Sequence, residues 1–92
     1  MDLKQIEKIS KALSDVNRLK ILHFMHHNRG RVECMAIGNL LPLAQPSISH
    51  HIKKLTEAGL ILPEKEGRYY SYSINTSLWE QFQEAIKSFD KS

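Results

Sequence analysis

The sequence predicts a mainly α-helical fold of five helices with one small β-hairpin. Three observations lead to this fold class. Apolar residues recur at helical spacing through most of the chain, the period shortens toward two after Gly59, and helical spacing returns before the C-terminus. No repeat or low-complexity tract interrupts the 92 residues, so we expect residues 1–92 to form a single domain with one modest core.

Composition restricts the class of protein. A hydrophobic fraction of 41% and a charged fraction of 25% are typical of a globular protein, and no apolar run approaches the roughly 18 residues of a membrane span, so no membrane association is expected. The N-terminal segment alternates charged and apolar residues, which argues against a signal peptide. Cys34 is the only cysteine, which excludes an internal disulfide and favours a cytoplasmic location. The net charge of +3 permits a polyanionic partner without requiring one.

Two helices are predicted in the first third of the chain. Residues 3–13 carry apolar side chains on one side only, which indicates an amphipathic helix. Ser14 and Asp15 offer an N-cap for a second helix over about residues 15–27, and Gly30 suits the left-handed turn that would end it. Apolar residues surround most of the second helix, so we expect it to be central and buried. These residues are Val16, Leu19, Ile21, Leu22, Phe24 and Met25.

Two shorter helices follow, joined by a tight turn. The first is expected over about residues 35–41, where Pro42 stops it. The second is expected over about residues 45–58, with Pro46 in its first turn and Gly59 at its end. Two short helices connected in this way are typical of a helix-turn-helix.

A change of period after Gly59 predicts a β-hairpin over about residues 60–74, with Glu66-Gly67 at its tip. The residues that alternate along its second strand are Tyr70, Tyr72 and Ile74. Arg31 to Cys34 is a candidate for a further short extended segment. A hairpin that directly follows a helix-turn-helix is a wing, so the predicted architecture is a winged helix-turn-helix.

The helix over residues 45–58 has one apolar stripe and one polar face. At about 100° per residue the apolar stripe is formed by Ile48, Ile52 and Leu55. His50 falls in the middle of the polar face, whereas His51 falls beside the stripe. Adjacent helical residues diverge too far to share one metal ion easily. We therefore expect His51 to be a packed, hydrogen-bonded residue and His50 to face outward.

The exposed face of the second helix of a helix-turn-helix enters the DNA major groove. Short polar side chains suit bases and phosphates, and cationic side chains suit phosphates. The expected DNA-binding residues are Gln45, Ser47, Ser49, His50, Lys53 and Lys54 on the helix, and Lys65 and Arg68 on the wing. Over residues 45–70 four basic side chains oppose three acidic ones, a balance of only +1. The prediction of double-stranded DNA as the partner thus depends on the order of elements, and a solvated helix face and hairpin remain the alternative.

Three segments carry a family resemblance, and together they span most of the chain. ALSDVNRLKIL (12–22), LAQPSISHHIKKLTEAGLI (43–61) and EGRYYSYSI (66–74) resemble, in order and spacing, the opening, recognition-helix and wing signatures of the ArsR family of bacterial winged-helix repressors. The resemblance implies a homodimer that binds an inverted-repeat operator and represses transcription. Val16 departs from the family's usual Pro, and Ala44 from the Ser that usually caps the recognition helix.

The resemblance also implies dimerisation through the first and last helices. A last helix over about residues 77–90 carries a heavily apolar stripe, which supports such an interface independently. The expected interface residues are Leu3, Ile6, Leu78, Trp79, Phe82, Ile86 and Phe89. The alternative is that the last helix packs only against the core of its own chain.

Many members of the family respond to metals, and the resemblance places their Cys-x-Cys pair at Glu33 and Met35. Their second site lies on the last helix, where this chain offers only three acidic side chains: Glu80, Glu84 and Asp90. We therefore expect no metal site and no cofactor, and an effector that the sequence does not identify. Two alternatives stay open: a metal-responsive repressor that uses His23 and His27, four residues apart, and a redox-responsive one that uses Cys34.

Other functional classes receive less support. The chain contains no nucleotide-binding glycine loop and no nucleophile motif, so we do not expect an enzyme. A winged helix that acts as a protein-interaction module is the remaining rival, because a fold does not determine a function. A protein-binding face would expose aromatic or aliphatic anchors, whereas the predicted face exposes Ser47, Ser49, His50 and Lys54.

Overall fold

The computed structural model describes residues 1–90 and shows, within that range, five α-helices and one three-stranded antiparallel sheet. The helices are α1 (Leu3–Leu13), α2 (Val16–His27), α3 (Cys34–Leu40), α4 (Gln45–Glu57) and α5 (Thr76–Lys87). The strands are β1 (Arg31–Glu33), β2 (Ile61–Glu66) and β3 (Tyr69–Ile74), and a short 3₁₀ helix, Ser88–Asp90, follows α5. This order confirms the predicted winged helix-turn-helix.

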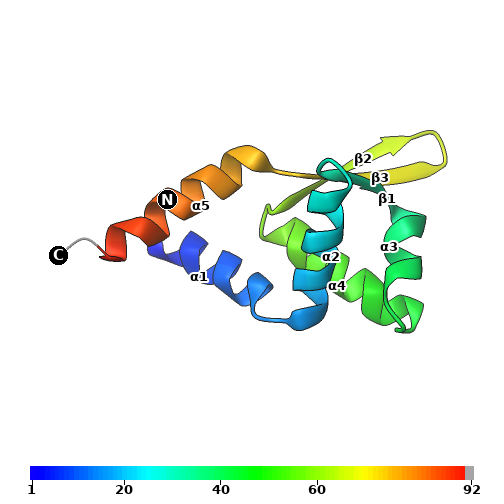
Figure 1. Ribbon diagram of the computed structural model, residues 1–92, viewed down its shortest axis with the longest axis horizontal. Coiled ribbons are helices and arrows are strands. Elements are labelled where there is room, and N and C mark those ends of the chain that lie inside the picture. The colour runs from blue at the N-terminus through cyan, green and yellow to red at the C-terminus, as the bar shows by residue number, and fades with distance from the viewer. Residues whose placement is uncertain (91–92) are drawn as a thin grey trace.

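The molecule is elongated, with extents of 48 × 24 × 22 Å. The terminal helices α1 and α5 lie side by side at one end, and the β2–β3 hairpin projects at the opposite end (Figure 1). α2 and α4 lie between these two ends, and α3 lies at the end that carries the hairpin (Figure 1). None of the helices in residues 1–90 combines the length and apolarity that a bilayer span requires.

Side-chain caps begin the first two helices. The Asp2 side chain accepts a hydrogen bond from the Gln5 backbone N–H, and the Gln5 side chain accepts one from the Asp2 backbone, which completes a capping box. Asp15 accepts hydrogen bonds from the backbone N–H groups of Asn17 and Arg18. Asp15 is thus the N-cap of α2, as predicted, and the helix itself starts one residue later.

The core lies where α2 crosses α4 and the sheet. It is built from aliphatic residues of almost every element: Ile9, Ala12, Ile21, Leu22, Met25, Val32, Ile37, Leu41, Ile48, Ile52, Leu55, Leu60 and Ile61. The central position predicted for α2 is confirmed by the burial of three of its residues. Val16 and Leu19, at its N-terminal end, remain exposed because no described element covers that side.

The strand order is β1-β3-β2, so the strand nearest the N-terminus pairs with the second strand of the hairpin. The extended segment expected at residues 31–34 is confirmed over residues 31–33 as β1, whereas Cys34 already belongs to α3; the pairing of β1 with β3 was not predicted. The hairpin tip was predicted one residue too early. Glu66 still pairs with Tyr69, and the two-residue loop is Gly67-Arg68, with Gly67 at φ 61°.

Other boundaries differ slightly from the predictions. α3 begins at Cys34 and α4 ends at Glu57, each one residue before the expected position. Gly59 has φ 80°, a left-handed conformation that favours glycine, and a Cβ there would lie in tight contact, 3.3 Å, with Leu78 Cδ2. The helix expected over residues 77–90 is regular α-helix only to Lys87, after which it tightens into the 3₁₀ turn.

Candidate nucleic-acid interface

Helix α4 presents one polar face to solvent. Ile48, Ile52 and Leu55 are almost completely buried and form the stripe that holds the helix on the core. The predicted contact residues of the helix are all exposed: Gln45, Ser47, Ser49, His50, Lys53 and Lys54. The structure therefore leaves the helical part of the predicted site accessible to a partner.

The N-terminus of α4 lacks a side-chain cap. Ala44 occupies the N-cap position without a side-chain hydrogen bond, and Pro46 lies in the first turn. The Ala44 carbonyl accepts hydrogen bonds from Ser47 and Ile48, so the helix starts regularly despite the missing cap. A helix N-terminus with free N–H groups and a positive dipole suits an anionic group such as a phosphate.

The two adjacent histidines have different environments, as predicted. The ring of His50 is exposed, whereas the side chain of His51 is only 12% exposed. His51 Nδ1 lies 3.3 Å from Arg18 Nη1, and it lies 3.9 Å from a carboxylate oxygen of Asp15. His51 thus anchors α4 to the start of α2, and His50 is left free to face a partner.

Arg18 extends this anchor to α1. Its Nε donates a hydrogen bond to the Ala12 carbonyl at 2.6 Å, and its Nη2 donates one to the Lys11 carbonyl at 3.2 Å. Sequence reasoning did not single out Arg18 in this role. Its partner His51 is 33 residues away, so no local pattern indicates the contact.

The Asp15 carboxylate takes part in the same network. Burial acts to raise its pKa, but hydrogen bonds from the backbone N–H groups of Arg18 and Asn17 lower it, and so do the charges of His51 and Arg18. The net effect holds the pKa of Asp15 below its ordinary value. An ionised Asp15 therefore contributes both to the cap of α2 and to the position of α4.

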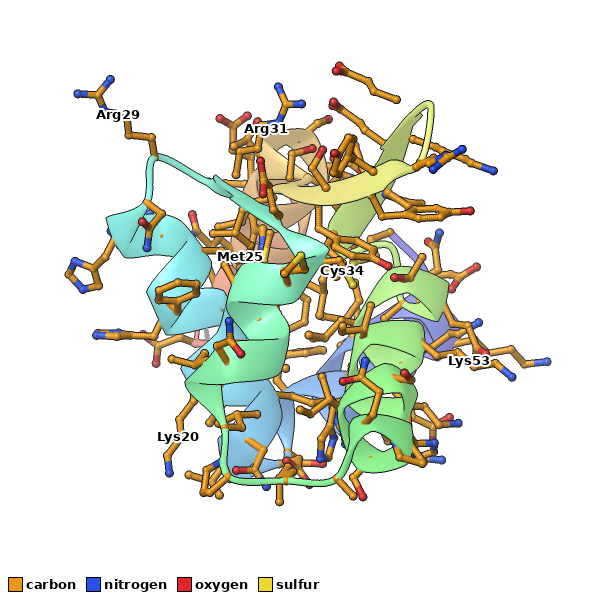
Figure 2. All side chains as sticks on the ribbon, turned by 90° about the vertical axis from the view of Figure 1, so that its right-hand side faces the viewer. Lys20, Met25, Arg29, Arg31, Cys34 and Lys53 are labelled. Atoms are coloured by element: carbon orange, nitrogen blue, oxygen red, sulfur yellow. The ribbon has the colours of Figure 1, made fainter. Side chains whose placement is uncertain are left out.

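A hollow of about 390 Å³ separates α4 from the sheet. It is lined by Cys34 at the start of α3, by Ser49 and Lys53 of α4, and by Pro63 and Tyr72 of the sheet, among others. Burial raises the pKa of the Tyr72 phenol, and the neighbouring groups of Cys34 and Tyr70 add to the rise. Figure 2 shows Lys53 projecting outward from α4, away from the core.

The wing carries the remaining predicted contacts, Lys65 and Arg68, and both are exposed. Arg68 occupies the second position of the hairpin loop, and Lys65 Nζ lies 5.6 Å from the centre of the Tyr70 ring. This distance is within the range of a cation–π interaction. Tyr70 was not among the predicted contacts. Its position opposite Lys65 follows from the strand register, which the sequence pattern did not determine.

The residues weighed as sensors lie at two places. The rings of His23 and His27 are 4.3 Å apart at the end of α2, with His26 beside them. In the part of the chain that the structure describes, no group of three His, Cys, Asp or Glu side chains is arranged to hold a metal ion. Cys34 is a half-buried free thiol at the start of α3.

The terminal helices divide the predicted interface residues into two groups. Leu78, Trp79 and Phe82 are partly buried against the core of their own chain. Leu3 and Phe89 are 72% and 65% exposed. An open groove of about 590 Å³ runs between α1 and α5, and its lining includes Met1, Leu3, Ile6, Glu84, Ala85 and Phe89.

The sequence is similar to those of known regulatory proteins. The family model described as "Bacterial regulatory protein, arsR family" matches residues 15–62. An uncharacterized HTH-type transcriptional regulator of Methanocaldococcus jannaschii is 36% identical over 84 residues, which cover 91% of this chain and 90% of that protein. The transcriptional repressor SdpR of Bacillus subtilis is 33% identical over 73 residues, 79% of each chain.

Solved structures share the fold. An ArsR-like transcriptional regulator from Rhodococcus sp. RHA1 superposes with a TM-score of 0.81 at 22% identity, covering 95% of this chain and 80% of that one. The homodimeric winged helix-turn-helix DNA-binding domain of Mb0332 from Mycobacterium bovis gives a TM-score of 0.74 at 24% identity, covering 97% of this chain and 82% of that one.

Proposed function

Because this chain belongs to the arsR family of bacterial regulatory proteins, which are DNA-binding transcriptional regulators, we propose that it represses transcription as a homodimer bound to an inverted-repeat operator. The observation that carries the proposal is the polar face of α4. That face is exposed along its length, and the helix is held in place by a buried apolar stripe and by the Arg18–His51 contact. Recognition of base edges requires a helix that is fixed in position and presents short polar side chains.

Roles follow from position and chemistry. Gln45, Ser47, Ser49 and His50 lie in the N-terminal half of α4, which meets base edges in a helix-turn-helix complex, so we assign base recognition to them. Two lysines on the helix and two cations on the wing would neutralise phosphates. These phosphate contacts are Lys53, Lys54, Lys65 and Arg68. The face offers no aromatic or aliphatic anchor, which argues against a protein-interaction module.

The homodimer would form along the groove between α1 and α5. Leu3, Ile86 and Phe89 leave a large apolar area exposed at this end of the molecule, as an interface between copies would. Ile6 lines the groove, and Leu78, Trp79 and Phe82 support α5 from the core side. A two-fold pair of chains would place two recognition helices about one turn of DNA apart and so match an inverted repeat. The Mb0332 domain, a structural neighbour, is itself described as homodimeric.

The proposal includes a single domain, a cytoplasmic location and no catalytic role. It also includes no metal cofactor, since Glu33 and Met35 stand where thiol ligands would be expected from the family resemblance.

Selection from a pool of random duplexes tests the proposal. We expect the purified protein to recover an inverted repeat, and gel-shift titrations on that repeat should weaken steeply as salt is raised, because phosphate contacts release counterions. A matched control is the double variant Ser49→Ala/His50→Ala. It should fold normally, but the duplexes it selects should share a weaker sequence preference. Recovery of no preferred sequence by the wild-type protein would contradict the proposal.

A further inference from the structure

The wing has no net charge. Its charged residues are two acids, Glu64 and Glu66, and two bases, Lys65 and Arg68, within five consecutive positions. Such a hairpin would not attract phosphates if its charges were mixed on one surface, because the acids would offset the bases at short range. Binding to DNA therefore depends on which face of the hairpin each charge occupies.

Strand register separates the charges. Residues directly opposite one another in an antiparallel pair share a face of the sheet, and successive residues alternate faces. Lys65 pairs with Tyr70, so these two side chains share one face. Glu64 pairs with Ser71 and Glu66 pairs with Tyr69, so both acids lie on the other face.

The Lys65–Tyr70 face adjoins the recognition helix. The next pair inward on this face is Pro63–Tyr72, and those residues line the same hollow as Ser49 and Lys53 of α4. Lys65 and Tyr70 therefore extend, toward the tip of the wing, the surface on which α4 presents its polar side chains. Tyr70 is 45% exposed, and its ring supports the Lys65 ammonium group at 5.6 Å.

Arg31 pairs with both acids on the opposite face. Its Nη2 lies 3.3 Å from a carboxylate oxygen of Glu64 and 3.7 Å from one of Glu66, and it donates a hydrogen bond to Ser71 Oγ at 3.2 Å. One guanidinium from β1 thus contacts both acids of β2 across β3. Figure 2 shows Arg31 on one side of the sheet and Lys53 of α4 on the other.

We propose that the wing is two-sided: Tyr70 contacts the DNA backbone beside Lys65, and Arg31 is a positioning residue that keeps Glu64 and Glu66 directed away from the phosphates. This inference rests on the proposed DNA-binding function. The Tyr70 hydroxyl is the group that would donate a hydrogen bond to a phosphate oxygen, while the ring packs against the sugar and keeps Lys65 in place. Arg31 itself would not touch DNA.

Adjacent tyrosines on opposite faces provide a matched pair of variants. Tyr70→Phe should weaken binding to the selected duplex by about 2- to 12-fold, the range expected for loss of one hydrogen bond, and equally for specific and scrambled duplexes. Tyr69→Phe removes the same hydroxyl from the other face and should leave affinity unchanged. Equal losses for the two variants, or no loss for Tyr70→Phe, would overturn the assignment of Tyr70.

A rescue experiment tests Arg31. Arg31→Gln frees the two carboxylates, and we expect a several-fold loss of affinity that becomes larger at low salt, where repulsion is less screened. Adding Glu64→Gln and Glu66→Gln to this variant should restore binding, because no acid then remains to be directed away. Failure of the restoration, with the fold intact by circular dichroism, would overturn the role of Arg31.

DNA binding by the wild-type protein distinguishes failure of this inference from failure of the function on which it rests. If the wild-type protein bound no duplex, both would fail. If the wild-type protein bound its selected duplex while the variants behaved unlike these expectations, only the two-sided wing would fail.

Discussion

Arg18 Nη1 lies 3.3 Å from Nδ1 of His51, and this contact links the recognition helix to the start of α2. The other two donors that Arg18 uses are directed at carbonyls near the end of α1. One side chain thus joins α1, α2 and α4, and through them the proposed dimer surface and the proposed DNA surface.

Replacement of Arg18 should therefore destabilise the fold. Arg18→Met keeps much of the packing but loses three hydrogen bonds, and we expect the free energy of unfolding to fall by about 1–3 kcal/mol. Urea denaturation followed by circular dichroism measures the change. Lys20→Met, an exposed position on the same helix, is the control and should stay within about 0.5 kcal/mol of wild type. Equal stability of the two variants would show that the network contributes nothing.

Asp15 makes stability depend on pH. Its pKa is lowered in the folded state, so the native protein binds fewer protons than the unfolded chain in the acid range. Its contribution is present above the unfolded-state pKa and is lost as pH falls through the folded-state pKa. Asp15→Asn, which preserves a capping side chain, should flatten the acid side of the stability profile measured by urea denaturation. The control Asp2→Asn retains Asp15 and should still lose stability as the pH falls. An Asp15→Asn variant that lost stability at low pH as the wild type does would contradict this role of Asp15.

Base reading and phosphate binding should respond differently to substitution. His50→Ala should relax preference at one base position, a discrimination worth about 1–3 kcal/mol, with little change in salt dependence. Arg68→Ala should weaken all duplexes similarly and reduce the salt slope by about one. Titrations against duplexes mutated at each position make the comparison. A change of sequence preference in Arg68→Ala but not in His50→Ala would reverse the assigned roles.

Charge at the exposed end of α1 should prevent dimerisation. Leu3→Glu places a carboxylate in the groove between α1 and α5, where a second copy would bury it unpaired. Sedimentation equilibrium should show dissociation, with little change in the fold of the single chain, because Leu3 is 72% exposed. Met35→Glu is the matched control, since Met35 is equally exposed but lies on α3 outside the groove. Unaltered dimerisation in Leu3→Glu, or equal loss in both variants, would place the interface elsewhere.

Most of the fold could be predicted from the helical spacing of apolar residues. The buried stripe of α4 and the outward direction of His50 were both correct, because a 13-residue helix on a core repeats its apolar residues clearly. The observed boundaries of helices and of the hairpin loop differ from the predicted ones by one residue where a cap or a turn determines the end of the element. The residues proposed for DNA contact are exposed as expected, while their contact with DNA remains a prediction.

Features that depend on pairing between distant segments could not be read from the sequence. β1 has only three residues, too few for a recognisable period, and its partner in β3 lies about 40 positions away. The same register places Tyr70 opposite Lys65 and puts Arg31 on the face that carries Glu64, so these contacts were missed as well. An apolar stripe predicts burial but not what covers it, and Leu78 and Trp79 prove to be covered in part by their own chain.

Competition between two duplexes tests the central claim, sequence-specific DNA recognition through α4, most directly. The duplex obtained by selection and a duplex of equal length and composition with both half-sites scrambled would be titrated against the wild-type protein at one fixed salt concentration. The account predicts that the selected duplex binds at least about 10³-fold more tightly. Equal affinity for the two duplexes would contradict it.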